Sequence, residues 1–255
     1  MRILCTDLDN TIIYSYRHDI GLKKRTVELC RGRAISFISE RTYELLKSVQ
    51  QEMMIVPIST RTEEQYSRID LGTGGFKYAL VCNGGVLLAD GKREADWYEN
   101  SLKLIEPGKA ELEKALVILE KESGRTSELR FIENLFLFTK CSDPEKAVDR
   151  LTSRLDRKRV DVFHKGEKVY VVPVQLSKGN AVMRLREYLD PEYIIAAGDS
   201  RFDLSMAEAA DWGIVPYGFT KKYRAVSALY EMDKDKLFSE ALLEMCLKIR
   251  AESIE

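Results

Sequence analysis

Short apolar runs alternate along the chain with segments of helical spacing. The runs are typical of buried strands and occupy residues 3–6, 53–58, 78–82, 193–197 and 212–215. Helical spacing follows most of them, over residues 40–51, 63–69, 181–188, 204–210 and 237–250. Strands and helices that alternate in this way predict an α/β fold, a doubly wound Rossmann-like parallel sheet covered by helices.

The pattern changes between residues 86 and 173. Helices are expected near 107–123 and 144–157, and each precedes a pair of strands, at 129–132 with 135–140 and at 160–164 with 168–172. This order is typical of an α+β domain and predicts an insertion at 86–173 that divides a core formed by 1–85 and 174–255. A smaller hairpin, residues 26–30 with 34–38, is expected as a flap near the N-terminal carboxylates.

Composition places the chain among ordinary soluble proteins. Its 255 residues are 45% hydrophobic and 32% charged, with a formal net charge of -1. The absence of a basic block argues against nucleic-acid or anionic-membrane partners, and no apolar run approaches membrane-spanning length. Five scattered cysteines and an N-terminus that enters a strand directly lead us to expect a reducing, cytoplasmic location without a signal peptide. The chain has two histidines, which makes a zinc site or a Ser-His-Asp triad an unfavoured interpretation.

Polar groups stand where the apolar runs stop. The first run ends at Asp7 and Asp9, whose carboxylates repel each other if both are ionised. The pair therefore favours a divalent cation between the two carboxylates, or a shared proton that makes one the nucleophile and the other the acid. By itself this segment is equally compatible with a simple turn. The other strand ends and helix starts carry Thr60, Lys178, and Asp199 with Asp203. Because ligands bind at the carboxyl edge of such sheets, these groups together would suit phosphoryl transfer.

The set of motifs resembles the haloacid dehalogenase (HAD) superfamily. Asp-x-Asp-x-Thr at 7–11, the strand-end Thr60, Ser-Lys-Gly-Asn at 177–180 and Gly-Asp-Ser-x-x-Asp at 198–203 occur in that family's order and at comparable spacing. The insertion between Thr60 and Lys178 is similar to the caps of the branch with Cof-type, sucrose-phosphate and mannosyl-3-phosphoglycerate phosphatases.

The resemblance implies a role for each motif. Asp7 would be the nucleophile that forms an aspartyl-phosphate, and Asp9 the general acid and base. Thr60 and Lys178 would hold the phosphoryl oxygens. The metal set would bind Mg²⁺ and comprises Asp7, the backbone carbonyl of Asp9, Asp199, and Asp203 directly or through water or Lys178.

Substrate contacts are expected from Thr11, Arg61, Asn83, Gly84 and Asn180. The segment Ser59-Thr60-Arg61-Thr62 departs from the family's common Thr-Gly-Arg, which leaves Arg61 as a substrate contact or as a salt bridge between core and cap. The implied function is a Mg²⁺-dependent phosphomonoesterase for a small phosphorylated metabolite, with a sugar phosphate as the leading expectation. The alternatives are a phosphotransferase or mutase like the phosphomannomutases, and a non-catalytic phosphometabolite-binding protein.

Overall fold

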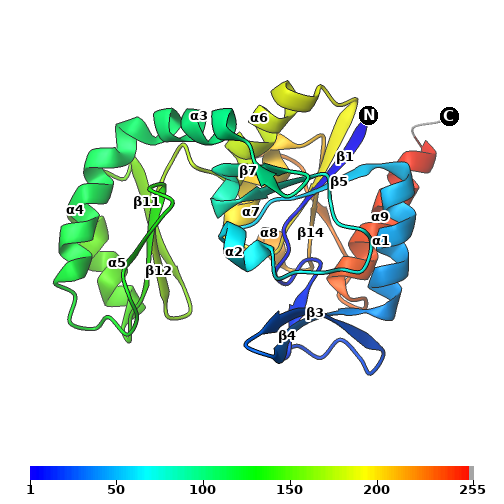
Figure 1. The fold of residues 1–255 in the computed structure, drawn as a ribbon, viewed down its shortest axis with the longest axis horizontal. Coiled ribbons are helices and arrows are strands. Elements are labelled where there is room, and N and C mark those ends of the chain that lie inside the picture. Colours follow the sequence, from blue (N-terminus) through cyan, green and yellow to red (C-terminus); the bar gives the residue numbers. More distant parts are fainter. Residues whose placement is uncertain (253–255) are drawn as a thin grey trace. The chain divides into compact units, whose positions relative to one another are not determined.

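The computed structural model describes residues 1–252 and contains a parallel five-stranded sheet, called the central sheet below (Figure 1). The strand order is β15-β14-β13-β1-β5, and every neighbouring pair is parallel. The strands are β1 (Arg2–Thr6), β5 (Met54–Pro57), β13 (Tyr193–Ala197), β14 (Trp212–Val215) and the short edge strand β15 (Tyr230–Glu231). The predicted α/β fold with a parallel sheet is confirmed.

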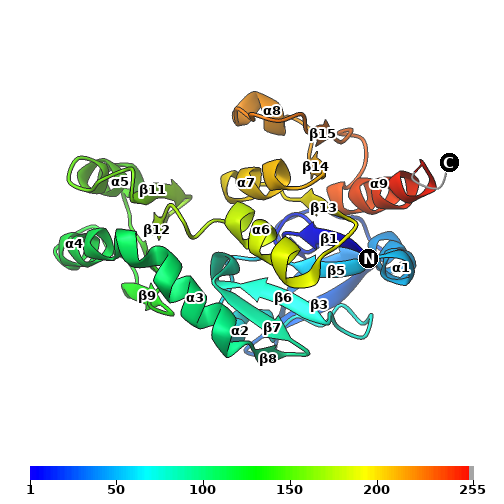
Figure 2. The ribbon, with the colours of Figure 1, turned by 90° about the horizontal axis from the view of Figure 1, so that it is seen from above.

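Helices cover both faces of this sheet. Helices α1 (Glu40–Glu52) and α9 (Phe238–Glu252) pack side by side on one face, and α6 (Lys178–Leu189) and α7 (Arg201–Ala209) lie on the other (Figure 2). The short helices are α2 (Glu63–Tyr66) and α8 (Phe219–Lys222). Ser39 caps α1 as expected, since its hydroxyl accepts a hydrogen bond from the Thr42 amide.

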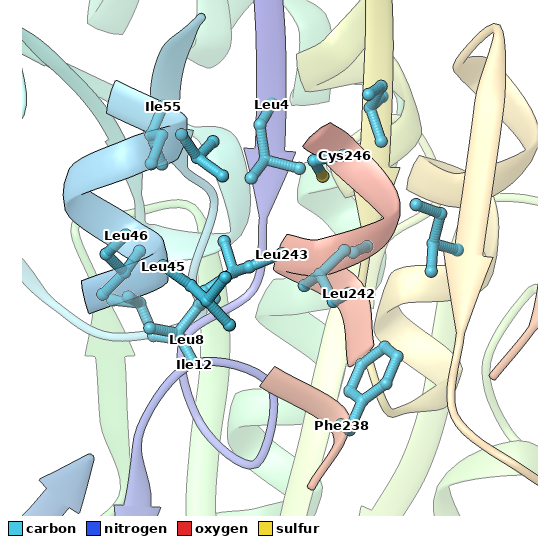
Figure 3. Packing of buried hydrophobic residues seen from close by; sticks show 14 of the residues in the cluster. Leu4, Leu8, Ile12, Leu45, Leu46, Ile55, Phe238, Leu242, Leu243 and Cys246 are labelled. Carbon is cyan, nitrogen blue, oxygen red and sulfur yellow. The ribbon is translucent and has the colours of Figure 1, made fainter. Parts of the chain in front are cut away.

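The apolar core fixes the strand that ends at Asp7. Leu4 of β1 is buried among Leu45 and Leu46 of α1 and Leu242 and Leu243 of α9 (Figure 3). Full burial of one such side chain contributes about 1.5–3 kcal/mol. The packing therefore gives the carboxylates that follow β1 a rigid support.

Two small sheets accompany the central one. Strands β3 (Lys24–Cys30) and β4 (Arg33–Ser39) form the expected hairpin, and β2 (Tyr14–Ser15) extends it in the order β2-β4-β3. The second sheet has the order β6-β7-β8, with β6 (Tyr78–Val81), β7 (Val86–Ala89) and β8 (Lys92–Arg93). The turn η1 (Cys82–Gly84) joins β6 to β7, and Asn83 there has a φ of 59°.

The inserted unit, residues 94–177, contains its own antiparallel sheet of order β11-β12-β10-β9. Its elements are α3 (Ala95–Ile105), η2 (Glu106–Gly108), α4 (Lys109–Glu120), β9 (Arg130–Ile132), β10 (Phe136–Lys140), α5 (Pro144–Thr152), β11 (Val160–Lys165) and β12 (Lys168–Pro173). Glu133 and Asn134 both have positive φ, as a two-residue type I′ hairpin turn requires.

The insertion begins later than the expected residue 86. Strand β7 pairs with β6, so residues 86–93 belong with the first unit, which comprises Met1–Arg93 and the chain from Lys178 onward. Helix α3 was not predicted, because Pro107 resembles a helix start and lies instead in the turn between α3 and α4. Among the described residues, none of the helices combines the length and apolarity needed to cross a bilayer.

Candidate active site

Asp7 and Asp199 meet at the carboxyl edge of the central sheet. Strands β13, β1 and β5 are adjacent and parallel, so the segments that follow them lie at the same edge. Asp7 comes directly after β1, and its amide donates to the Ala197 carbonyl at 2.8 Å, which ties it to the end of β13. Asp199 follows β13 after one glycine and accepts a hydrogen bond from the Asn10 side chain.

Lys178 connects two of the predicted carboxylates. Its side chain is 1% exposed, and its Nζ donates to Asp7 Oδ1 at 2.7 Å and to Asp203 Oδ1. The other oxygen of Asp203 accepts from the amide and the hydroxyl of Ser200 at the start of α7. Asp203 therefore holds Lys178 against Asp7 with both of its oxygens engaged.

Two glycines permit this close arrangement. A Cβ at position 198 would overlap the side chain of Asp203, so only glycine leaves room for that carboxylate. A Cβ at position 179 would meet the backbone of Ser205, and the Gly179 amide donates to the Ser205 hydroxyl at 3.1 Å. Gly179 thus allows α6 and α7 to pack closely, and Gly198 leaves room for the Asp203 carboxylate that contacts Lys178.

The cluster carries more negative than positive charge. One oxygen each of Asp7, Asp199 and Asp203 lies within 4.8 Å of the other two, and Lys178 contacts the carboxylates of Asp7 and Asp203. Burial first, and then the charge of Asp203, raise the pKa of Asp7 to about 8, while Lys178 opposes the rise. Burial disfavours the charge of Lys178, but Asp203 and Asp7 outweigh it and raise the lysine's pKa. These oxygen ligands with unbalanced charge fit a hard divalent cation.

Asp9 lies in a different set of contacts. Arg61 binds it at two points, from Nε to Oδ2 and from Nη2 to Oδ1, both at 2.8 Å. The same guanidinium donates to both oxygens of Glu28 at 2.8 and 2.9 Å. Burial disfavours the charge of Arg61, but its hydrogen bonds to Asp9 and Glu28 outweigh this and raise its pKa. The described ion pairs of Arg61 therefore lie within the first unit.

Glu28 is a residue that the sequence did not single out. Its side chain is 0% exposed, although most of its neighbours on β3 are exposed. The register of β3 against β4 shifts on both sides of Glu28, and such a bulge leaves Val27 and Glu28 buried in succession. Since a bulge breaks the alternation of faces, no periodicity in the sequence could have revealed the inward side chain.

Glu28 also leads to a prediction about stability and pH. Burial disfavours its charge, but hydrogen bonds from Arg61 and Ser36 outweigh this and lower its pKa. A lowered folded-state pKa stabilises the protein above the unfolded value of about 4.3, and this contribution is lost as the pH falls. Glu28→Gln should therefore lower the free energy of unfolding by about 3 kcal/mol at pH 7. In urea titrations, the difference in the free energy of unfolding between wild type and variant should be smaller at pH 4 than at pH 7. An equal difference at the two pH values would contradict this assignment.

The other predicted substrate residues lie in varied surroundings. Thr11 is 0% exposed, and its hydroxyl has no hydrogen-bond partner among the residues described. Asn83 and Gly84 are buried in η1, which lies against α6, whereas Asn180 is exposed near the start of α6.

Thr60 follows the end of β5 and is half-buried. Its neighbour Ser59 is 1% exposed and accepts from the Arg61 amide at 3.2 Å. Ser59 is therefore a second candidate hydroxyl at this strand end.

Comparisons with known proteins agree with this geometry. Residues 92–215, which include Lys178, Asp199 and Asp203, match the family model of haloacid dehalogenase-like hydrolases. A phosphoglycolate phosphatase from Methanopyrus kandleri is 24% identical over 188 residues, covering 71% of this chain and 78% of that protein. This part of the chain is therefore similar to the haloacid dehalogenase-like hydrolases.

Solved structures of phosphatases share the fold over almost the whole chain. A sucrose-phosphatase from Synechocystis sp. PCC6803, in complex with sucrose and phosphate, has a TM-score of 0.65 at 17% identity, covering 98% of this chain and 99% of that one. A trehalose-6-phosphate phosphatase from Aspergillus fumigatus has a TM-score of 0.51 at 15% identity, covering 96% and 92%. The predicted resemblance to haloacid dehalogenase-type phosphatases is confirmed, and these matches support the prediction of an enzyme.

Proposed function

We propose that this protein is a Mg²⁺-dependent phosphomonoesterase of the haloacid dehalogenase type, which acts on a small phosphorylated metabolite through an aspartyl-phosphate. The observation that carries the proposal is the position of Asp7, at the end of a buried strand, 2.7 Å from the buried Lys178 and beside two further carboxylates. A carboxylate held next to a fixed cation suits attack on a phosphoryl group.

In the first step, an oxygen of Asp7 attacks phosphorus and the bond from phosphorus to the ester oxygen breaks. The leaving oxygen takes a proton from Asp9 and departs as an alcohol. Lys178 lies where its charge can stabilise the transferring phosphoryl oxygens, and Thr60 or Ser59 would donate a hydrogen bond to them.

In the second step, water attacks the phosphorus of the aspartyl-phosphate and gives a proton to Asp9. The bond between phosphorus and Asp7 breaks, which releases inorganic phosphate and restores both carboxyl groups. Asp9 accepts hydrogen bonds from Arg61 with both carboxylate oxygens, and this contact fixes its orientation.

Asp7, Asp199 and the backbone carbonyl of Asp9 would hold Mg²⁺, with Asp203 in support through Lys178. When bound, the ion supplies neutralisation of phosphoryl charge. Its charge would also lower the pKa of Asp7 and keep the nucleophile ionised.

For the substrate we propose a sugar phosphate. The relatives' names, sucrose-phosphatase, trehalose-6-phosphate phosphatase and phosphoglycolate phosphatase, support a small phosphomonoester. We also propose that the inserted unit, which separates Thr60 from Lys178 in the chain, selects the leaving group. The test is phosphate release from sugar, polyol, glycolate and nucleotide phosphates with Mg²⁺ and with EDTA. Release that requires Mg²⁺ is expected; no release from any ester would contradict the proposal.

The metal assignment predicts a specific defect for Asp199→Asn. Replacing a charged oxygen ligand by a neutral amide weakens the attraction for Mg²⁺. The Mg²⁺ concentration for half-maximal phosphate release should rise about tenfold or more, a loss of roughly 1.4 kcal/mol in binding. Asp149→Asn, at an exposed position on α5, is the matched control and should leave it unchanged. An unaltered Mg²⁺ requirement in Asp199→Asn would remove this residue from the metal site.

A further inference from the structure

The Arg61 guanidinium has no donor left for a substrate anion. Its N–H groups number five. Two bind the oxygens of Asp9, two bind the oxygens of Glu28, and one reaches the Gln65 carbonyl at 3.3 Å. A phosphate or carboxylate of the substrate could bind Arg61 only by displacing one of these partners. The arrangement therefore differs from that of a substrate-binding arginine.

Glu28 holds this guanidinium from the side opposite Asp9. Its buried oxygens accept hydrogen bonds from Arg61, from Ser36 Oγ at 2.7 Å and from Arg68 Nε at 3.3 Å. A buried carboxylate is tolerated only with such partners. Because Ser36 is on β4 and Glu28 on β3, the hairpin fixes the carboxylate independently of Arg61.

Asp9 is the most exposed side chain of the three. Its side chain is 46% exposed, compared with 13% for Arg61 and 0% for Glu28. Exposure thus increases from Glu28 through Arg61 to Asp9, so that a buried carboxylate supports an accessible one. A two-point contact with a guanidinium fixes both the position and the plane of a carboxylate, which a single hydrogen bond does not.

We propose that Glu28 is a positioning residue: through Arg61 it orients the Asp9 carboxylate for proton transfer to the leaving oxygen. This inference rests on the proposed function, in which Asp9 is the general acid. It assigns a role in the reaction to the β3–β4 hairpin and removes Arg61 from the residues that bind the substrate directly. Glutamine at position 28 would offer one acceptor oxygen and turn N–H groups toward Arg61 or Ser36, so it should disturb the orientation.

The test compares two esters by kcat/KM. This constant covers the steps up to release of the alcohol or phenol, and thus only the first half of the reaction. An alkyl phosphate such as glycerol 3-phosphate needs a proton on its leaving oxygen, whereas p-nitrophenyl phosphate has a good leaving group and does not. Glu28→Gln should lower kcat/KM about tenfold or more for the alkyl ester and less than about threefold for the nitrophenyl ester, because general acid catalysis contributes roughly 10²–10⁴-fold.

Two further variants make the comparison decisive. Arg61→Lys keeps the charge but cannot bind both carboxylates at two points each, and it should give the same selective loss, so it replaces Glu28→Gln if that variant does not fold. Arg25→Gln breaks the ion pair between Arg25 of the same hairpin and Glu40 of α1, and it should leave the hydrolysis of both esters unaffected.

Equal losses for the two esters, or no loss for either, would overturn the positioning role. If wild-type protein hydrolyses neither ester nor any compound of the wider panel, the proposed function itself fails and the inference with it.

Discussion

Asp7→Asn is expected to abolish phosphate release while leaving the fold intact. The amide oxygen of asparagine can still accept the hydrogen bond from Lys178, so the buried contact is retained. Asparagine lacks the anionic oxygen that attacks phosphorus, and no aspartyl-phosphate can form. The loss of turnover should be at least about 10³-fold, comparable with the removal of nucleophiles in other enzymes that work by covalent catalysis.

The measurement is phosphate release on the best ester of the panel, beside a thermal unfolding scan. Removing one negative charge from a cluster of three carboxylates should keep or raise the melting temperature in EDTA, because burial and Asp203 disfavour an ionised Asp7. A variant that is folded and inactive supports the nucleophile assignment. Turnover like that of wild type would exclude Asp7 as the nucleophile.

Lys178→Met should affect both stability and turnover. Methionine has a similar length but no charge, and it would leave the carboxylates of Asp7 and Asp203 facing each other in a buried site. Removal of one partner from a buried ion pair costs about 3–5 kcal/mol, so we expect a loss of that size in the free energy of unfolding. Turnover should fall as well, because no fixed cation remains beside the phosphoryl group.

Urea unfolding in EDTA and in Mg²⁺ checks this expectation. A divalent cation in the carboxylate cluster would replace part of the missing positive charge, so Mg²⁺ should restore more stability to Lys178→Met than to wild type. Lys103→Met, which changes an exposed lysine of α3, is the matched control and should leave the free energy of unfolding unchanged. If Lys178→Met were as stable as wild type in EDTA, the buried lysine would not hold the two carboxylates together.

The central sheet was predictable because its signals are local. Apolar runs of strand length, such as the one before Asp7, are separated by amphipathic segments of helical length, and their order restricts the topology to a doubly wound sheet. Helix α3 could not be predicted, because Pro107 resembles the start of a helix. Strand β7 could not be predicted, because its short apolar run directly follows the turn at 83–85. These differences moved the boundary of the insertion, but they did not change the order of the strands at the site.

The site was predictable in its composition but not in its contacts. Strand ends placed Asp7 and Asp199 at one edge, since parallel neighbours share their carboxyl ends. The partner of Arg61 depends on a β-bulge and on pairing between segments far apart in the chain, and neither leaves a trace in hydrophobic periodicity. Glu28 and the buried Ser59 therefore came from the structure, whereas Lys178 and Asp203 came from the sequence.

The central claim is that the reaction passes through a phosphate on Asp7. The most direct measurement quenches the enzyme with acid during turnover of the best ester and reduces the protein with borohydride, which converts an acyl phosphate to an alcohol. Mass spectrometry of the N-terminal peptide should then find homoserine in place of Asp7, and the signal should disappear in samples quenched without substrate. Phosphate release with residue 7 unmodified, or reduction at another carboxylate, would contradict the account.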